Sequence, residues 1–188
     1  MARTGTADKR VRLVDAAAAL AYEQGFHRTT LGEIAQRADV PIGNVYYYFR
    51  TKEAIGFALI QQQVLEYRRL REHWDELRGP RERLTAFVQM TIDRRRDLAR
   101  NGCPIGSLCS ELCKQDGRLG EDASRLFADW LEWLADQFRA LGKGSQSPDL
   151  ALHLLSALQG ATVLTHSFGT PRHVEREARH LMSWIGDL

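Results

Sequence analysis

Several features are scarce or missing in this chain of 188 residues, and each absence excludes a class of protein. No run approaches the roughly 20 apolar residues of a membrane-spanning helix. The three cysteines match no zinc module, and a structural disulfide is not expected in the cytosol. No Gly-rich phosphate loop, Gly-x-Ser-x-Gly motif or catalytic carboxylate pair accompanies the six histidines, so neither an enzyme nor a metal site is expected. No segment alternates as strands do, and we predict an all-α protein.

The composition is that of an ordinary soluble globular protein, with 44% apolar and 27% charged residues. The net charge of +2 is small, but it is concentrated at the N-terminal end. Residues 1–56 carry eight basic and six acidic groups, and the remainder carries 18 of each. Such an excess fits a nucleic-acid partner and equally a solvated helix face. The alanine-rich residues 16–21 are too short for a signal peptide, so we expect a cytoplasmic protein with no membrane partner.

Residues 30–52 have the pattern of two short helices joined by a tight turn. Thr30 and Glu33 form a predicted capping box at the start of the first helix. Pro41 cannot continue that helix but suits the start of the next one, in which Val45 marks the buried face. The other side chains of the second helix project away from the core: Ile42, Gly43, Asn44, Tyr46 and Tyr47. This arrangement is typical of a helix-turn-helix, whose second helix enters the DNA major groove.

Residues 10–56 also resemble the N-terminal head of the TetR family of bacterial transcriptional repressors. Three runs carry the resemblance: Gly25-Phe26-x-x-Thr29-Thr30, Ile34-Ala35-x-x-Ala38-x-Val40 and Val45-Tyr46-Tyr47-Tyr48-Phe49-x-x-Lys52-Glu53. The resemblance implies a homodimer with an all-helical, ligand-sensing C-terminal domain, and it implies repression rather than activation.

We predict that the second short helix reads the operator. The resemblance implies that Ile42, Gly43 and Asn44 face base edges; Asn44 suits adenine and Ile42 a thymine methyl group. Hydroxyls, cations and helix-end N–H groups suit phosphate contacts. The predicted DNA-binding residues are Arg28, Thr30, Ile42, Gly43, Asn44, Tyr46, Tyr47 and Lys52. The alternative is that these are plain surface residues of a helical bundle.

Helical periodicity continues along the rest of the chain. The expected helices are 7–24, 52–74, 81–100, 104–115, 119–141, 149–167 and 171–186. Residues 142–148 have the composition of a flexible linker. We predict a helix-turn-helix head over residues 1–50 and an all-helical effector-binding and dimerisation domain over residues 51–188.

The predicted helix 149–167 is apolar nearly all round, with Leu158 among its leucines, and such a helix must be covered on every side. We interpret it and helix 171–186 as a dimer interface, in which two helices of each subunit form a four-helix bundle. The small residues Gly160 and Ala161 would allow a close crossing. Burial within a single chain is the alternative.

All three cysteines lie in residues 101–113. Cys103 directly precedes Pro104, at the expected start of a helix, where backbone N–H groups stabilise a thiolate and raise its reactivity. The Gly-Cys-x-x-Gly motif at residues 102–106 is similar to a subgroup of TetR regulators that includes an electrophile- and reactive-chlorine-sensing member. Cys109 and Cys113 fall on one helix face. The alternative is that all three are small buried side chains.

The sequence therefore favours a homodimeric DNA-binding regulator, released from a palindromic operator by a small-molecule effector or by thiol modification. No cofactor is expected. Two alternatives remain open: a switch driven by Cys103 alone, and a helical protein whose helix-turn-helix no longer binds DNA. Four apolar side chains could line an effector cavity or simply form core: Phe87, Met90, Trp130 and Trp133.

Overall fold

The computed structural model describes residues 3–114 and 117–188. Within these residues every regular element is helical, with ten α-helices and one short 3-10 helix, so the all-α prediction is confirmed. The chain divides into two compact units, and each unit combines separate stretches of sequence. Unit 1 takes the described residues of 1–66 and 107–124, and unit 2 takes residues 67–106 and 125–188.

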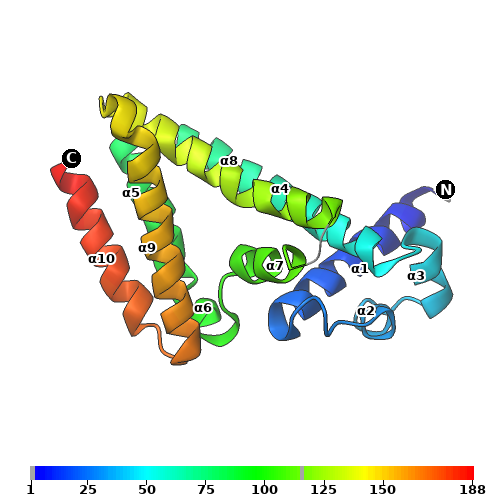
Figure 1. Ribbon diagram of the computed structural model, residues 1–188. Coiled ribbons are helices and arrows are strands. Elements are labelled where there is room, and N and C mark those ends of the chain that lie inside the picture. Colours follow the sequence, from blue (N-terminus) through cyan, green and yellow to red (C-terminus); the bar gives the residue numbers. More distant parts are fainter. Residues whose placement is uncertain (1–2, 115–116) are drawn as a thin grey trace. The chain divides into compact units, whose positions relative to one another are not determined.

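Unit 1 contains the three helices of the predicted head: α1 (Arg3–Gln24), α2 (Leu31–Arg37) and α3 (Ile42–Tyr48) (Figure 1). The first part of α4 (Lys52–Asp75) follows them directly. One side chain from each of these four helices is almost fully buried: Leu13, Ile34, Val45 and Ile55. The helix starts agree with the sequence for α3 and α4, whereas α1 begins four residues before the predicted residue 7.

The predicted single helix over residues 81–100 is wrong. It consists of α5 (Pro80–Asp93) and α6 (Arg95–Asn101), separated at Arg94, where φ is −92° and ψ is 7°. The guanidinium of Arg95 donates to the Ile92 carbonyl at 2.9 Å and pairs with the Glu175 carboxylate at 2.9 Å. The Arg95 side chain thus caps the end of α5 and contacts the last helix of the chain. No glycine or proline lies at this break, so the sequence carries no local sign of it.

The predicted flexible linker at residues 142–148 is also ordered. After α8 (Arg118–Ala140) comes the 3-10 helix η1 (Gly144–Gln146), and α9 (Ser147–Ser167) already starts inside the predicted linker. Ser147 is fully buried, and the Lys143 ammonium donates to the Leu188 carbonyl at 2.7 Å. The small polar residues here form a tight connection between two helices. Flexible linkers have the same composition, so composition alone did not distinguish the two.

In unit 2, α9 lies beside α10 (Arg172–Asp187) (Figure 1). One side of α9, including Leu154 and Leu158, is buried in the core of the unit itself. The interpretation of Leu158 as a dimer-interface residue is therefore wrong. Exposed apolar side chains remain on the other side of α9 and just beyond its end: Leu152, Val163, Leu164 and Phe168, at 54%, 63%, 48% and 68%.

The aromatic candidates for an effector cavity pack into the core of unit 2. Trp130 stacks on Tyr67 with ring centroids 4.3 Å apart, and Phe87 meets the Trp130 ring at 4.7 Å. These rings and Trp133 are each at most 6% exposed. No helix in the described part of the chain is both long and apolar enough to cross a membrane.

Candidate DNA-binding site

The capping box at the start of α2 is present as predicted. The Thr30 hydroxyl accepts the backbone N–H of Glu33 at 3.2 Å. In return the Glu33 carboxylate accepts the backbone N–H and the hydroxyl of Thr30, each at 2.8 Å. These hydrogen bonds lower the pKa of Glu33, with the Thr30 hydroxyl as the largest cause. The cap fixes the residue at which α2 begins.

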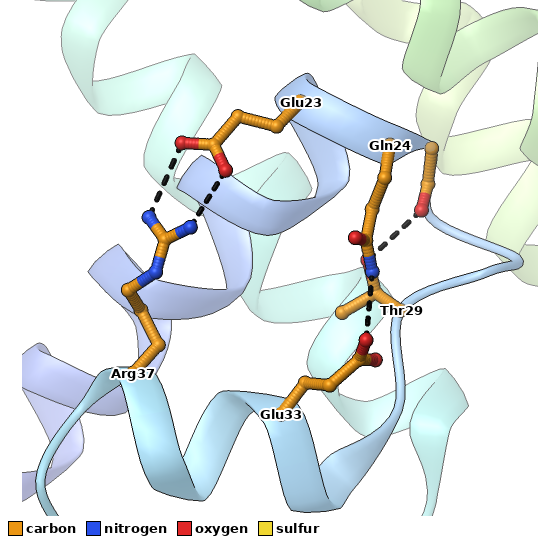
Figure 2. Close-up of polar contacts among 6 residues, drawn as sticks. Glu23, Gln24, Thr29, Glu33 and Arg37 are labelled. Atoms are coloured by element: carbon orange, nitrogen blue, oxygen red, sulfur yellow. Dashed lines mark hydrogen bonds and ion pairs between the residues drawn. The ribbon is translucent and has the colours of Figure 1, made fainter.

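Two further side-chain contacts tie α1 to α2, and Figure 2 shows both. Arg37 donates to both carboxylate oxygens of Glu23, at 3.2 and 2.6 Å. Gln24 donates to the Glu33 carboxylate at 3.3 Å. The Arg37 hydrogen bond lowers the pKa of Glu23 and raises that of Arg37. The α1–α2 pair is thus held at both ends of α2.

Arg12 of α1 holds the turn between α2 and α3. Its guanidinium donates to the Ala38 carbonyl, and to the Asp39 carbonyl and carboxylate at 3.0 and 3.3 Å. Asp39 has φ +51°, a left-handed conformation that a short polar residue tolerates. The backbone N–H of Val40 then donates to the Ala35 carbonyl at 3.0 Å. Sequence reasoning missed Arg12, because no local signal links it to a turn 26 residues away.

The predicted recognition helix, α3, presents an open face. Val45 is fully buried and anchors the helix, while Ile42, Tyr46 and Tyr47 are 46%, 56% and 75% exposed. Asn44 is half-buried. A Cβ added at Gly43 would meet nothing within 4 Å. The predicted base-reading residues therefore lie on one short helix with room for a partner.

The predicted phosphate contacts differ in how far the chain itself occupies them. Arg28 is exposed, whereas the Thr30 hydroxyl is used in the cap. The Lys52 ammonium donates to the His27 carbonyl at 2.6 Å and lies 5.2 Å from the centre of the Phe26 ring. The structure thus gives Lys52 a role inside the head, and its contact with DNA stays a prediction.

The cysteines occupy three different environments around α7 (Pro104–Leu112). Cys103 lies just before α7 in unit 2, half-buried, and its sulfur accepts the Gly106 N–H at 3.3 Å. Cys109 is buried and donates to the Ala123 carbonyl at 3.1 Å. Cys113 is exposed and follows the last residue of α7, so burial of all three cysteines is wrong.

The predicted helix 104–115 reaches only Leu112, and its predicted end lies outside the described residues. Cys103 belongs to unit 2, and the predicted DNA contacts belong to unit 1. Within the described residues no group of three His, Cys, Asp or Glu side chains is placed to hold a metal ion.

Two protein families match this chain, and together they cover the helix-turn-helix and most of the C-terminal helices. Residues 13–59 match the tetR family of bacterial regulatory proteins. Residues 80–180, more than half of the chain, match the C-terminal domain of LmrA/YxaF-like transcriptional regulators. The chain belongs to the TetR family. The prediction that it is not an enzyme is confirmed, because this family consists of transcriptional regulators.

Individual TetR-family relatives agree with this assignment. The HTH-type transcriptional repressor NemR of Escherichia coli (strain K12) is 33% identical over 61% of this chain, but the match spans only 57% of that repressor. The HTH-type transcriptional regulator LmrA of Bacillus subtilis (strain 168) is 24% identical, with 96% of both chains covered.

Solved structures share the fold. A regulatory protein TetR from Rhodobacter sphaeroides is 25% identical, covers 93% of this chain and 97% of its own, and has a TM-score of 0.80. The reduced form of E. coli NemR, at 22% identity, covers 93% of this chain and 95% of its own, with a TM-score of 0.81. The second similarity supports the fold alone.

Proposed function

We propose that this TetR-family regulator is a homodimer that binds a palindromic operator in double-stranded DNA and represses transcription in the cytoplasm. A small-molecule effector or a thiol modification would release it. The single observation that carries the proposal is the open face of α3, where Ile42, Tyr46 and Tyr47 are exposed. Exposed aromatic and apolar side chains on a short, rigidly anchored helix suit contact with base edges and phosphates.

The proposed dimer uses the exposed side of α9. About half of the surface of Leu152, Val163 and Leu164 is exposed there, and Gly160 between them is exposed with nothing within 4 Å of an added Cβ. A twofold axis would pair this surface with itself. Removal of the exposed part of these apolar side chains from water is favourable, by roughly 25 cal/mol per Å² of apolar surface buried.

Repression would depend on the spacing of the two recognition helices. In a dimer they must reach successive major grooves, about 34–36 Å apart or a multiple of that distance. An effector bound in unit 2 that favours another spacing releases the DNA. A coupling free energy of roughly 1–3 kcal/mol changes the affinity about 5–150-fold, so a small rearrangement is sufficient.

Selection of DNA sequences with the purified protein tests this proposal. We expect a palindromic consensus, bound with an affinity that falls steeply as salt rises, because phosphate contacts release counterions. Recovery of no consensus, together with no salt-dependent retention of DNA, would contradict it. That result would favour the alternative of a helical protein that no longer binds DNA.

A second candidate function, a switch driven by Cys103, is favoured by the surroundings of this sulfur. It accepts the Gly106 N–H at 3.3 Å, and the Gln159 side-chain amide lies 3.6 Å away. A Cβ added at Gly106 would lie 2.9 Å from the Gln159 Oε1 and 3.2 Å from the Cys103 Cβ, so the glycine permits this close approach. Two N–H donors around a half-buried sulfur are the contacts on which this second candidate rests.

Alkylation separates the two functions. Iodoacetamide forms an S–C bond with the thiolate and expels iodide. If Cys103 is the input, alkylation should weaken operator binding in the wild type but not in Cys103→Ser, which should bind normally beforehand. Cys103 should also react faster than Cys109 and Cys113. Equal labelling rates would contradict the reactivity, and release of alkylated Cys103→Ser would assign sensing to another residue.

A further inference from the structure

Glu111, in the last turn of α7, contacts the turn between α1 and α2 although it lies about 85 residues away in sequence. Its carboxylate accepts the backbone N–H of Phe26 at 3.1 Å and that of His27 at 2.8 Å. The Nε2 of the His27 ring lies 3.2 Å from the Glu111 backbone oxygen. All these residues belong to unit 1. A single residue of α7 thus satisfies two backbone donors just beyond the end of α1.

The turn is shaped to admit this carboxylate. Gly25 has φ +93°, and a Cβ added there would lie 3.0 Å from the Glu111 Oε1. Phe26 is 5% exposed, and the Lys52 ammonium holds the His27 carbonyl at 2.6 Å. Backbone donors that follow a helix need an acceptor, and leaving them unpaired is costly. The acceptor for two of them comes from the part of the chain that matches the C-terminal domain.

The same turn determines where α2 starts. The Thr29 hydroxyl donates to the Gly25 carbonyl at 2.9 Å, and Thr30 then caps α2. Hydrogen bonds from backbone N–H groups to a carboxylate are stronger than neutral ones. Since α2 leads directly into α3 along the chain, loss of these bonds would loosen one of the two holds on α3; the other is the contact of Arg12 with the α2–α3 turn.

We propose that Glu111 is a positioning residue for DNA binding. Its carboxylate holds the α1–α2 turn, and through α2 the recognition helix α3, in the geometry that binds DNA. The proposal rests on the proposed function, because it requires that α3 contacts an operator. It adds a residue outside the predicted head to the groups on which DNA affinity depends.

Two variants of the full chain test it: Glu111→Ala, and Glu132→Ala as a control that removes the same charge from an exposed position of α8. The control is needed because loss of any negative charge favours DNA binding through electrostatics. We expect Glu111→Ala to bind the selected operator about 10-fold more weakly or worse, the scale of losing a charge-assisted hydrogen bond, and Glu132→Ala to stay within about twofold of the wild type.

Amide hydrogen exchange separates positioning from a general loss of stability. In Glu111→Ala the amides of Phe26 and His27 should exchange faster, while amides in the core of unit 2 keep their protection and the helical circular dichroism is unchanged. Wild-type affinity, or unchanged protection of these two amides, overturns the proposal. If Glu111→Ala does not fold, Glu111→Gln is used; it keeps one acceptor oxygen and should show a smaller loss of affinity and protection.

Failure of this inference is distinguishable from failure of the proposed function. If the wild type selects no DNA sequence, the proposed function fails, and the proposed effect of Glu111 on DNA affinity fails with it. If, in addition, the amides of Phe26 and His27 exchange equally fast in the wild type and in Glu111→Ala, then Glu111 does not hold the α1–α2 turn either. If the wild type binds its operator and Glu111→Ala binds equally well, only the role of Glu111 is excluded.

Discussion

Asn44 is the residue on which we predict that base reading depends most directly. It is half-buried near the start of α3, and a side-chain amide suits bidentate contact with adenine. We predict that Asn44→Ala removes the preference at one base pair of each half-site, at a cost of roughly 1–3 kcal/mol, and leaves the dimer intact. Competition binding with single-base operator variants measures this.

Gln61→Ala is the matched control for Asn44, because it removes an exposed side-chain amide from α4. It should leave the base preferences unchanged. If the preferences of Asn44→Ala match those of the wild type at every position, Asn44 does not read a base.

The pair formed by Glu23 and Arg37 predicts a dependence of stability on pH. The Arg37 hydrogen bond lowers the pKa of Glu23 in the folded state. A lowered pKa contributes stability that is present above the unfolded value of about 4.3 and is lost as pH falls through the folded value. Acidification below about pH 4 should therefore lower the free energy of unfolding more in the wild type than in Glu23→Gln.

Urea unfolding of both proteins at pH 6 and in acid measures this difference. The pair is exposed, so the gap at pH 6 should be small, roughly 0.2–1 kcal/mol, and it should shrink in acid. Glu132→Gln serves as the control and should keep the wild-type pH dependence. A gap between wild type and Glu23→Gln that stays constant with pH would show that the ion pair contributes nothing.

For single residues, contacts between sequence neighbours were predictable and contacts between distant residues were not. The capping box of Thr30 and Glu33 was predictable because its partners are three residues apart. Arg12 and Glu111 also shape the head, but their partners lie 26 and 85 residues away and are brought near only by tertiary packing. Neither the residue type nor the spacing in the sequence predicts such contacts.

For the elements, the exposed side of α9 yields a prediction about assembly. Val163→Arg would place unpaired charges in the proposed interface, where burial costs on the order of several kcal/mol. We expect monomers in sedimentation and weaker operator binding, with the helical content retained because Val163 is 63% exposed in its own chain.

Leu65→Arg is the control, because Leu65 is 51% exposed and belongs to α4 in unit 1, not to α9. It should leave the dimer intact. An intact Val163→Arg dimer would place the interface on another surface. Leu158→Arg tests something else, since Leu158 is 4% exposed within the chain and its substitution should unfold unit 2.

The contrast between Leu158 and Val163 shows what periodicity cannot provide. A helix that is apolar nearly all round was predictable from residues 149–167, and so was its need for cover on several sides. Which side of α9 the chain covers by itself depends on where α10 and α6 pack, and this is a property of the tertiary structure. The break at Arg94 and the ordered conformation of residues 142–148 also depend on tertiary packing.

For the whole molecule, the proposed dimer predicts a strict dependence on operator spacing. The recognition helices of one dimer must enter grooves on the same side of the DNA, one turn or a multiple apart. Insertion of about 5 base pairs between the half-sites rotates one of them to the opposite side of the duplex. We expect a loss of affinity of at least about 10-fold in gel-shift assays.

An inserted sequence of equal length placed outside the operator is the control and should have no effect. Equal affinity for the original and the respaced operator would mean that each subunit binds its half-site alone, which contradicts a rigid dimer as the DNA-binding unit.

The division of unit 1 into two stretches of chain has a consequence for synthesis and for protein engineering. A ribosome adds about 5–20 residues per second, so the α1–α2 turn is made several seconds before Glu111 exists to accept its N–H groups. Leu119 arrives later still, and its side chain packs 3.0 Å from the position of a Cβ at Gly56. If the head were exchanged between relatives at a boundary near residue 59, the N–H groups of its α1–α2 turn would face the acceptor residue of another protein. Transfer of DNA specificity should therefore move residues 107–124 together with residues 1–66.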